Sequence, residues 1–369
     1  MAKRLPVTVI TGFLGAGKTT VLRHLLTRGG QRLAVMVNEF GSVGLDGDLI
    51  RSCGFCPEEE VDGRLVELNN GCLCCTVQDD FLPTMETLLE RADQLDGIVV
   101  ETSGLALPRP LLQALDWPAI RSRVHVNGVV TLVDGEALAA GSPVADAEAL
   151  ERQRAEDPSL DHLTAIDDLF EDQLQAADLV LISRADCLDA SAMAEVQGRI
   201  KDKVRPGTAL LPVSQGQVET SVVLGLEHKP TPQEAHTHHD NDHHDHDHHD
   251  HSHVDMVGSN VRVEVALDRQ ALEQLLPSLV SNLQVVRLKG RVWLPSKTLP
   301  LQIQMVGPRL NSWFEAAPSH AWRPDQGCGA DLVVLALNEA AAPALESGLQ
   351  RLVQATPAKA SPAAATPES

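Results

Sequence analysis

The stretch that most restricts the fold is GFLGAGKT at residues 12–19, which matches the turn pattern G-x-x-x-x-G-K-[ST]. It follows the apolar run VTVIT and leads into KTTVLRHLL, whose apolar spacing predicts a helix. In such a strand–turn–helix unit, the backbone N–H groups and the positive end of the helix dipole bind phosphate oxygens. We therefore expect a nucleotide here, surrounded by Gly12, Gly15, Ala16, Gly17 and Thr20.

Two side chains of this turn and one distant carboxylate carry the expected chemistry. Lys18 is expected to reach the β- and γ-phosphates, and the Thr19 hydroxyl to bind Mg²⁺. A P-loop enzyme also needs an acidic group near the metal, at the end of another strand. The run DGIVVETSGLA supplies it, because Glu101 stands where an apolar strand ends. We expect Lys18 and Glu101 to be catalytic, and Thr19 and Glu101 to hold Mg²⁺.

The first 225 residues alternate short apolar runs with helical patterns, which predicts an α/β domain with a mostly parallel sheet. The apolar runs lack strict alternation, as expected when both faces of a sheet are buried. The expected strands are 7–11, 34–38, 97–101, 128–133, 179–182 and 209–213, and the expected helices are 18–27, 79–91, 166–176 and 191–203. This P-loop domain is assigned to residues 1–225.

The composition changes abruptly at residues 236–253, which read HTHHDNDHHDHDHHDHSH and contain no apolar residue. Such a segment cannot bury a core, so a disordered linker is expected at 226–257, with imidazoles that bind divalent ions weakly. Beyond it, NVRVEVAL, LPLQIQMV and ADLVVLAL read as strands and 268–276 as a helix. A smaller α+β domain is therefore expected at 258–350, followed by a disordered tail at 351–369.

The net charge and the placement of the cysteines limit the partners and the cellular compartment that can be expected. The formal net charge of −21 argues against a nucleic-acid partner, because phosphates would be repelled. No apolar run reaches the roughly 18 residues of a membrane span, so no membrane partner is expected. The cysteines gather in CGFC and CLCC clusters, a pattern more typical of metal or redox chemistry than of a disulfide framework. A cytoplasmic protein is expected.

The choice of base depends on the run LVLISRAD, which ends another expected strand. P-loop proteins select guanine with an Asp carboxylate that accepts two hydrogen bonds from the base, within an N/T-K-x-D pattern. Asp186 has that position, and the methylene stem of Arg184 can cover the base in place of lysine. Ser183 replaces the usual Asn or Thr and gives a shorter bracing contact. The pattern favours GTP.

Three cysteines crowd the segment LNNGCLCCTV, between the phosphate-binding turn and the acidic strand end. In P-loop switches this interval rearranges when the γ-phosphate leaves. Thiolates suit Zn²⁺ and similar late divalent ions, and three sulfurs leave a tetrahedral site incomplete, as an exchangeable metal requires. We therefore expect Cys72, Cys74 and Cys75 to bind the metal. A structural zinc that also takes Cys53 and Cys56, or a redox role for either cluster, remains an alternative.

Together, GFLGAGKTT, VNEFG, LNNGCLCCTV, ETSGLA and KGRVWLP resemble the CobW family of metallochaperone GTPases, over about residues 5–340. The resemblance implies a GTPase domain followed by a smaller C-terminal domain. It implies that GTP–Mg²⁺ binding assembles the cysteine site and that hydrolysis releases the metal to a client. It also places Glu39 in the first switch, near Mg²⁺ or the γ-phosphate, and makes Asp46 a candidate for positioning water or supporting a metal ligand.

Residues 151–174, ERQRAEDPSLDHLTAIDDLFEDQL, and the His-rich linker are similar to the cobalamin branch of that family. This resemblance implies Co²⁺ as cargo and the cobalt-insertion machinery of corrin synthesis as client. Thiolates alone do not select cobalt, because Zn²⁺ tends to bind N/S sites more tightly. Three alternatives remain: a zinc chaperone of the same family, a P-loop kinase or ATPase with a structural zinc, and a metal-storage protein dominated by the His tract.

Overall fold

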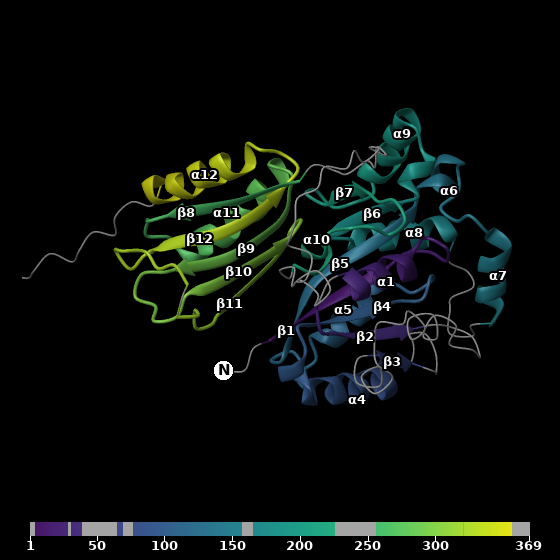
Figure 1. The fold of residues 1–369 in the computed structure, drawn as a ribbon, viewed down its shortest axis with the longest axis horizontal. Coiled ribbons are helices and arrows are strands. Elements are labelled where there is room, and N and C mark those ends of the chain that lie inside the picture. Colours follow the sequence, from purple (N-terminus) through teal and green to yellow (C-terminus); the bar gives the residue numbers. More distant parts are fainter. Residues whose placement is uncertain are drawn as a thin grey trace, which may run out of the picture.

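The computed structural model describes residues 4–28, 31–38, 65–68, 77–156, 165–225, 256–319 and 321–355. Two sheets organise them, one in the N-terminal part and one in the C-terminal part of the chain (Figure 1). The first is seven-stranded, in the order β3-β2-β4-β1-β5-β6-β7, and the second is five-stranded, in the order β11-β10-β9-β12-β8. Within these residues, no helix is both long and apolar enough to cross a membrane.

The seven-stranded sheet is parallel at every pairing. Its strands are β1 (Leu5–Thr11), β2 (Leu33–Asn38), β3 (Leu65–Leu68), β4 (Gly97–Glu101), β5 (Val124–Asp134), β6 (Leu179–Ser183) and β7 (Ala209–Pro212). The helices around it are α1 (Lys18–Arg28), α4 (Val77–Glu90), α5 (Pro108–Leu115), α6 (Gly135–Ala139), α7 (Ala147–Glu156), α8 (Ile166–Ala176), α9 (Ala190–Lys201) and α10 (Thr220–Leu224), with 3-10 turns η1 (Ala92–Gln94) and η2 (Ala185–Cys187). The α/β fold class predicted from the sequence is confirmed.

Burial on both faces explains why these strands show no alternation in the sequence. All residues of β1 and β4 are buried. One face packs against α1 through Leu22 and Leu25, and the other packs against α4 through Phe81 and Met85. Helices therefore cover both faces, as parallel sheets require.

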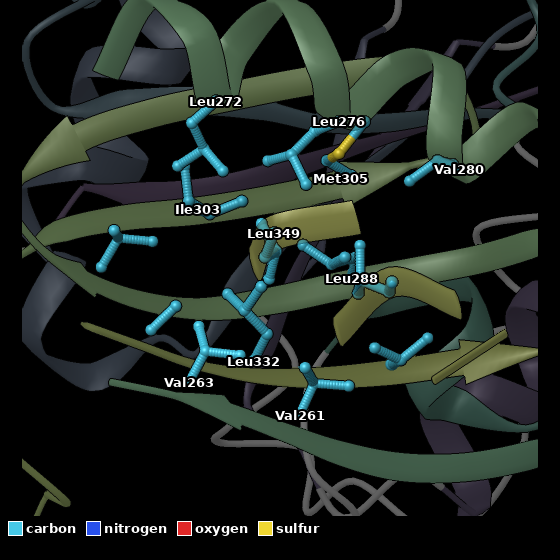
Figure 2. Packing of buried hydrophobic residues seen from close by; sticks show 14 of the residues in the cluster. Val261, Val263, Leu272, Leu276, Val280, Leu288, Ile303, Met305, Leu332 and Leu349 are labelled. Atoms are coloured by element: carbon cyan, nitrogen blue, oxygen red, sulfur yellow. The ribbon is translucent and has the colours of Figure 1, made fainter. Parts of the chain in front are cut away.

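The C-terminal sheet is antiparallel and has helices on one face. Its elements are β8 (Val257–Val263), α11 (Arg269–Asn282), β9 (Val285–Trp293), β10 (Leu301–Val306), β11 (Arg309–Phe314), β12 (Gly329–Ala336) and α12 (Ala341–Ala355). Figure 2 shows Leu272 and Leu276 of α11 directed toward Ile303 and Met305 of β10. This α+β arrangement agrees with the expected class of the second domain.

Some boundaries differ from those expected. Helix α11 continues beyond residue 276, through Pro277, to Asn282. Helix α12 ends at Ala355 and Leu352 packs against the core, so residues 351–355 belong to this helix and not to the tail. The strands β3, β9 and β11 were not expected. Residues 226–255 and 356–369, the greater part of the expected linker and tail, lie outside the described residues.

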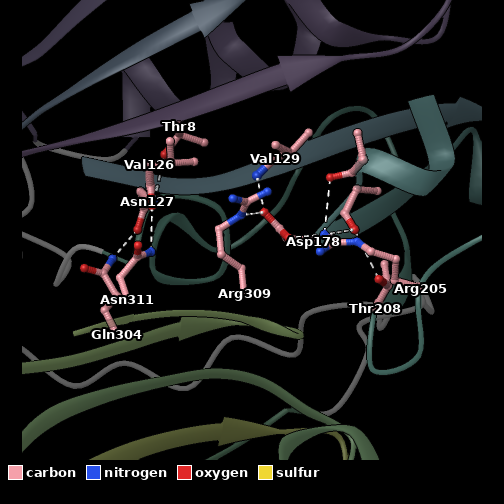
Figure 3. Close-up of polar contacts among 12 residues, drawn as sticks. Thr8, Val126, Asn127, Val129, Asp178, Arg205, Thr208, Gln304, Arg309 and Asn311 are labelled. Atoms are coloured by element: carbon pink, nitrogen blue, oxygen red, sulfur yellow. Dashed lines mark hydrogen bonds and ion pairs between the residues drawn. The ribbon is translucent and has the colours of Figure 1, made fainter. Parts of the chain in front are cut away.

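The C-terminal sheet contacts the edge of the first sheet at which its parallel strands begin. Asn311 Nδ2 donates to Val126 O near the start of β5 over 2.9 Å, and Arg309 pairs with Asp178, the residue before β6 (Figure 3). Val286 and Val306 also join the hydrophobic cluster that α1 forms with the first sheet. The opposite edge, where the strands end, carries the phosphate-binding turn.

Candidate functional site

The turn between β1 and α1 has a backbone that glycine alone adopts easily. Gly12, Gly15 and Gly17 have φ values of 139°, 77° and 95°, in the region that side chains disfavour. Gly12 also lies against β5, because a Cβ there would lie 2.3 Å from Leu132 O. The glycines of the sequence pattern are thus required by the shape of this turn.

Lys18 folds back onto that turn. Its Nζ donates to Gly12 O over 2.9 Å and to Phe13 O over 3.0 Å, and the side chain is buried. These contacts hold the ammonium group at the loop, where a negatively charged phosphate chain would be bound by charge as well as by hydrogen bonds. The structure thus places the Lys18 ammonium group at the turn, and its role toward the phosphates stays a prediction.

Glu101 lies beside the start of α1. Strands β1 and β4 are neighbours in the sheet, and Thr19 Oγ1 donates to Glu101 Oε1 over 3.2 Å. Glu101 is only 3% exposed, so the carboxylate is held inside the protein beside the hydroxyl. A hydroxyl and a carboxylate are hard oxygen ligands of the kind that Mg²⁺ prefers. The residues present therefore fit a magnesium ion at this position.

The ETSGLA turn after Glu101 packs directly on the phosphate-binding turn. A Cβ on Gly104 would lie 2.7 Å from Leu14 N. Gln173 of α8 anchors this turn by hydrogen bonds: its Nε2 donates to Gly104 O over 3.1 Å and to Ala106 O over 3.3 Å. Sequence reasoning missed Gln173. The available signal was an amide residue on the apolar face of the helix at 166–176.

The residues expected to recognise the base lie at the end of β6 and just after it. Ser183 is beside the phosphate-binding turn, since a Cβ on Gly17 would lie 3.6 Å from Ser183 Cβ. The backbone of Arg184 is in the left-handed region, with a φ of 54°. Its guanidinium pairs with Asp134 over 3.1 Å and with Glu136 over 3.3 Å. Asp186 is exposed in η2, two residues after Arg184. The structure thus brings the base end and the phosphate end of the expected site together.

A further turn at residues 214–217 joins this site and was not expected. Gln217 N donates to Ser214 O over 3.0 Å, and the loop approaches α1 so closely that a Cβ on Gly216 would lie 2.8 Å from Thr20 Cγ2. The preceding residue, Val213, accepts a hydrogen bond from Ala185 N over 3.2 Å. The turn therefore lies between η2 and the first turn of α1. Its signal in the sequence was SQG directly after a strand.

Comparison with known proteins places this arrangement in a family. Residues 6–212 match the model described as "CobW/HypB/UreG, nucleotide-binding domain", which covers more than half of the chain. The chain belongs to the CobW/HypB/UreG family. Residues 256–353 match a second model, "Cobalamin synthesis protein cobW C-terminal domain". As a member of the CobW family, this protein is a GTPase.

Curated relatives resemble the CobW-family chain over most of its length. A "Zinc chaperone CobW" of Pseudomonas aeruginosa is 45% identical over 340 residues, which is 90% of this chain and 87% of the relative. Another, from Sinorhizobium sp, is 40% identical over 365 residues, or 95% of this chain and 98% of the relative. The "Zinc-regulated GTPase metalloprotein activator 1" of Schizosaccharomyces pombe is 44% identical over 134 residues, or 35% of this chain and 32% of the relative.

Of the expected metal ligands of this CobW-family chain, Thr19 and Glu101 are described, whereas Glu39, Cys72, Cys74 and Cys75 lie outside the described residues. Asp46, expected to position water or support a ligand, and the alternative ligands Cys53 and Cys56 also lie outside them. Among the described residues, no group of three or more His, Cys, Asp or Glu side chains is placed to hold a metal ion. Two cysteines are described: Cys187 is exposed and Cys328 is partly buried. The cysteine site therefore remains a prediction from the sequence.

Proposed function

We propose that this protein is a GTP-dependent metal chaperone that takes up a divalent metal ion on Cys72, Cys74 and Cys75 while Mg²⁺–GTP is bound. Hydrolysis of GTP then releases the metal to a client protein. The names of the two long relatives, both called zinc chaperones, support this proposal. One observation in the structure carries it further, namely the position at which the cysteine segment leaves the sheet.

The cysteine segment begins at the edge of the sheet that carries Glu101. Glu101 pairs in register with Val37 of β2, and the next residue of β2, Asn38, pairs with Leu68 of β3. Leu68 is the last residue of β3 and precedes the segment NNGCLCC. Two strand spacings, about 10 Å, separate Glu101 on β4 from the end of β3, with β2 between them. A rearrangement around the γ-phosphate is thus close enough in the fold to change the start of the cysteine segment.

Part of the proposed hydrolytic machinery lies among the described residues. Lys18 would bind the β- and γ-phosphates, and Thr19 and Glu101 would hold Mg²⁺, which neutralises charge on the phosphate oxygens when bound. We assign Glu39 to the first switch, close to Mg²⁺ or the γ-phosphate, and Asp46 to positioning water or supporting a metal ligand. Asp186, with Ser183 and Arg184 beside it, would select guanine.

Coupling between nucleotide and metal must act in both directions. If GTP tightens metal binding, the metal tightens GTP binding by the same factor. A coupling free energy of about 1–3 kcal/mol changes affinity about 5- to 150-fold, which is enough to convert uptake into release.

The identity of the metal separates two versions of this proposal. The names of the relatives support Zn²⁺, which also binds N/S ligands more tightly than Co²⁺ in the usual order. The resemblance of residues 151–174 to the cobalamin branch supports Co²⁺, with the cobalt-insertion machinery as client. We propose Zn²⁺ as the better supported cargo and Co²⁺ as the second candidate.

The test is an anaerobic Co²⁺ titration followed by thiolate-to-cobalt charge-transfer absorbance, with and without Mg²⁺ and a non-hydrolysable GTP analogue. The full chain is compared with a variant that lacks residues 236–253, and each titration ends with a Zn²⁺ challenge. A one-to-one site that tightens with nucleotide and disappears in Cys72→Ala supports the proposal. Retention of Co²⁺ against Zn²⁺ would favour cobalt as cargo. Equal affinity with and without nucleotide would instead indicate a structural metal.

A further inference from the structure

Arg287 of β9 is a buried cation that links the C-terminal domain to the GTPase domain. It is only 6% exposed, its Nε donates to Val222 O and its Nη2 to Val223 O, and its Nη1 donates to Asn127 Oδ1 over 3.2 Å. Burial lowers the pKa of Arg287 to about 9, against the opposing attraction of Asp178. The guanidinium is therefore protonated at neutral pH and requires these acceptors.

Two of its three acceptors are carbonyl groups in the last turn of α10. The final carbonyls of a helix have no donor within the helix, so they need partners elsewhere. Arg287 supplies two of these partners, and Asn127 Nδ2 supplies a third by donating to Leu224 O over 3.0 Å. Gly225 ends the helix with a φ of 63°, and a Cβ there would lie 2.5 Å from Arg287 Nη1. The end of α10 is thus shaped around a side chain from the other domain.

Helix α10 in turn supports the nucleotide-binding residues. It follows the 214–217 turn, in which Gly216 lies against Thr20 at the start of α1. Val222 and Val223 belong to the same hydrophobic cluster as Val21 and Leu22 of α1. A displacement of α10 would therefore act first on the turn beside the expected base-recognition residues, because α1 is also held to the sheet by Leu22 and Leu25.

We infer that Arg287 is a positioning residue for nucleotide binding: by capping α10 from the C-terminal domain, it fixes the 214–217 turn against the nucleotide site. The C-terminal domain then contributes to GTP affinity without touching the nucleotide. This inference rests on the placement of the base given under the proposed function, beside Ser183 and Asp186. It does not depend on the cysteine site or on the metal.

The test compares Arg287→Gln and Arg287→Lys in the full chain, with Arg262→Gln as the matched control. Arg262 lies in the same domain and pairs with Asp331 over 2.8 Å at an exposed position. Loss of one or two charged hydrogen bonds predicts that Arg287→Gln weakens binding of a fluorescent GDP about 10-fold and raises KM for GTP similarly. The kcat should stay within about 2-fold, because no group that touches the phosphates has changed. Arg287→Lys should restore part of the affinity, and Arg262→Gln should match the unmodified chain.

A fall in melting temperature with unchanged GDP affinity would overturn the inference and leave Arg287 a purely structural residue. Should Arg287→Gln fail to fold, hydrogen exchange on the unmodified chain gives the answer. Nucleotide binding should slow exchange in residues 214–225 and 285–289 together, whereas protection confined to residues 12–20 would contradict the inference. Because neither measurement uses the cargo metal, failure here is distinct from failure of the chaperone proposal.

Discussion

Thr19 and Glu101 are 82 positions apart in the sequence, yet Thr19 Oγ1 donates a hydrogen bond to Glu101 Oε1 over 3.2 Å. The parallel pairing of β1 with β4 brings them together at the end of both strands. Two oxygen groups that meet in this way fit a Mg²⁺ ion, which we propose would neutralise phosphate charge there.

Loss of either oxygen group should impair hydrolysis through the metal. Thr19→Ala and Glu101→Gln are each expected to lower kcat for GTP by about 100-fold or more, since a bound metal supplies several kcal/mol of charge stabilisation. The measurement is GTP hydrolysis as a function of Mg²⁺ concentration, with Thr19→Ser as the control that keeps the hydroxyl. A Mg²⁺ dependence unchanged in Thr19→Ala would place the metal elsewhere.

Close packing of the ETSGLA turn on the phosphate-binding turn should make Gly104→Ala damaging. The new Cβ would lie 2.7 Å from Leu14 N, a backbone atom, so one of the two turns must shift. We expect weaker nucleotide binding, by about 10-fold or more, together with a lower melting temperature. Gly198→Ala in α9 is the control, because no atom of the described residues outside the neighbouring helix backbone lies within 4 Å of its Cβ position, and alanine favours helix. Equal affinities for the two variants would refute the importance of this packing.

Guanine selection should depend on the carboxylate of Asp186. Hydrogen bonds to a charged acceptor contribute about 1.5–3 kcal/mol, so Asp186→Asn is expected to weaken GTP binding by about 10- to 150-fold. The same variant should gain affinity for xanthosine triphosphate, which offers an acceptor where guanine offers a donor. Asp189→Asn is the control, since Asp189 caps α9 and asparagine caps equally well. If Asp186→Asn binds GTP normally, another group reads the base.

The buried carboxylate of Asp178 should be important for stability. It is fully buried, pairs with Arg205 and Arg309, and accepts from Val129 N over 2.8 Å (Figure 3). Asp178→Asn leaves both arginines without their carboxylate, and removal of one partner from a buried pair costs about 3–5 kcal/mol. Urea unfolding would measure this loss.

An exposed ion pair provides the comparison for Asp178. Arg109 and Asp172 lie 3.8 Å apart, with 66% and 44% of their side chains exposed. Asp172→Asn should change the free energy of unfolding by less than about 1 kcal/mol. Losses of similar size in Asp172→Asn and Asp178→Asn would show that the buried pair adds nothing beyond a surface ion pair.

The sequence predicted those parts of the site in which backbone geometry forces the residue type. The glycines and Lys18 of the phosphate-binding turn, and Glu101 at a strand end, are found where the pattern placed them. Helix α8 at Ile166–Ala176 also has the expected bounds, because its apolar periodicity is complete. In each case a local rule and the tertiary structure require the same residues.

Other parts depend on tertiary partners that no local pattern contains. Strand β9 was missed because Arg287, Lys289 and Arg291 alternate along it, and arginine and lysine side chains usually indicate exposure. Arg287 is buried only because the end of α10 supplies its acceptors. Gln173 was missed for a similar reason, since its donors are satisfied by carbonyls of a distant turn. The burial of Arg287 and of Gln173 thus depends on hydrogen-bond acceptors that lie far away in the sequence.

The hydrophobic cluster that takes Val286 and Val306 from the C-terminal sheet, together with Leu22 and Val222, has a consequence for how the chain melts. A boundary drawn near residue 225 by composition crosses this cluster, although the C-terminal sheet and its helices also have a hydrophobic cluster of their own. Calorimetry should therefore record one cooperative transition for both halves. A nucleotide that binds one half would then raise the melting temperature of the other, because the two halves unfold together.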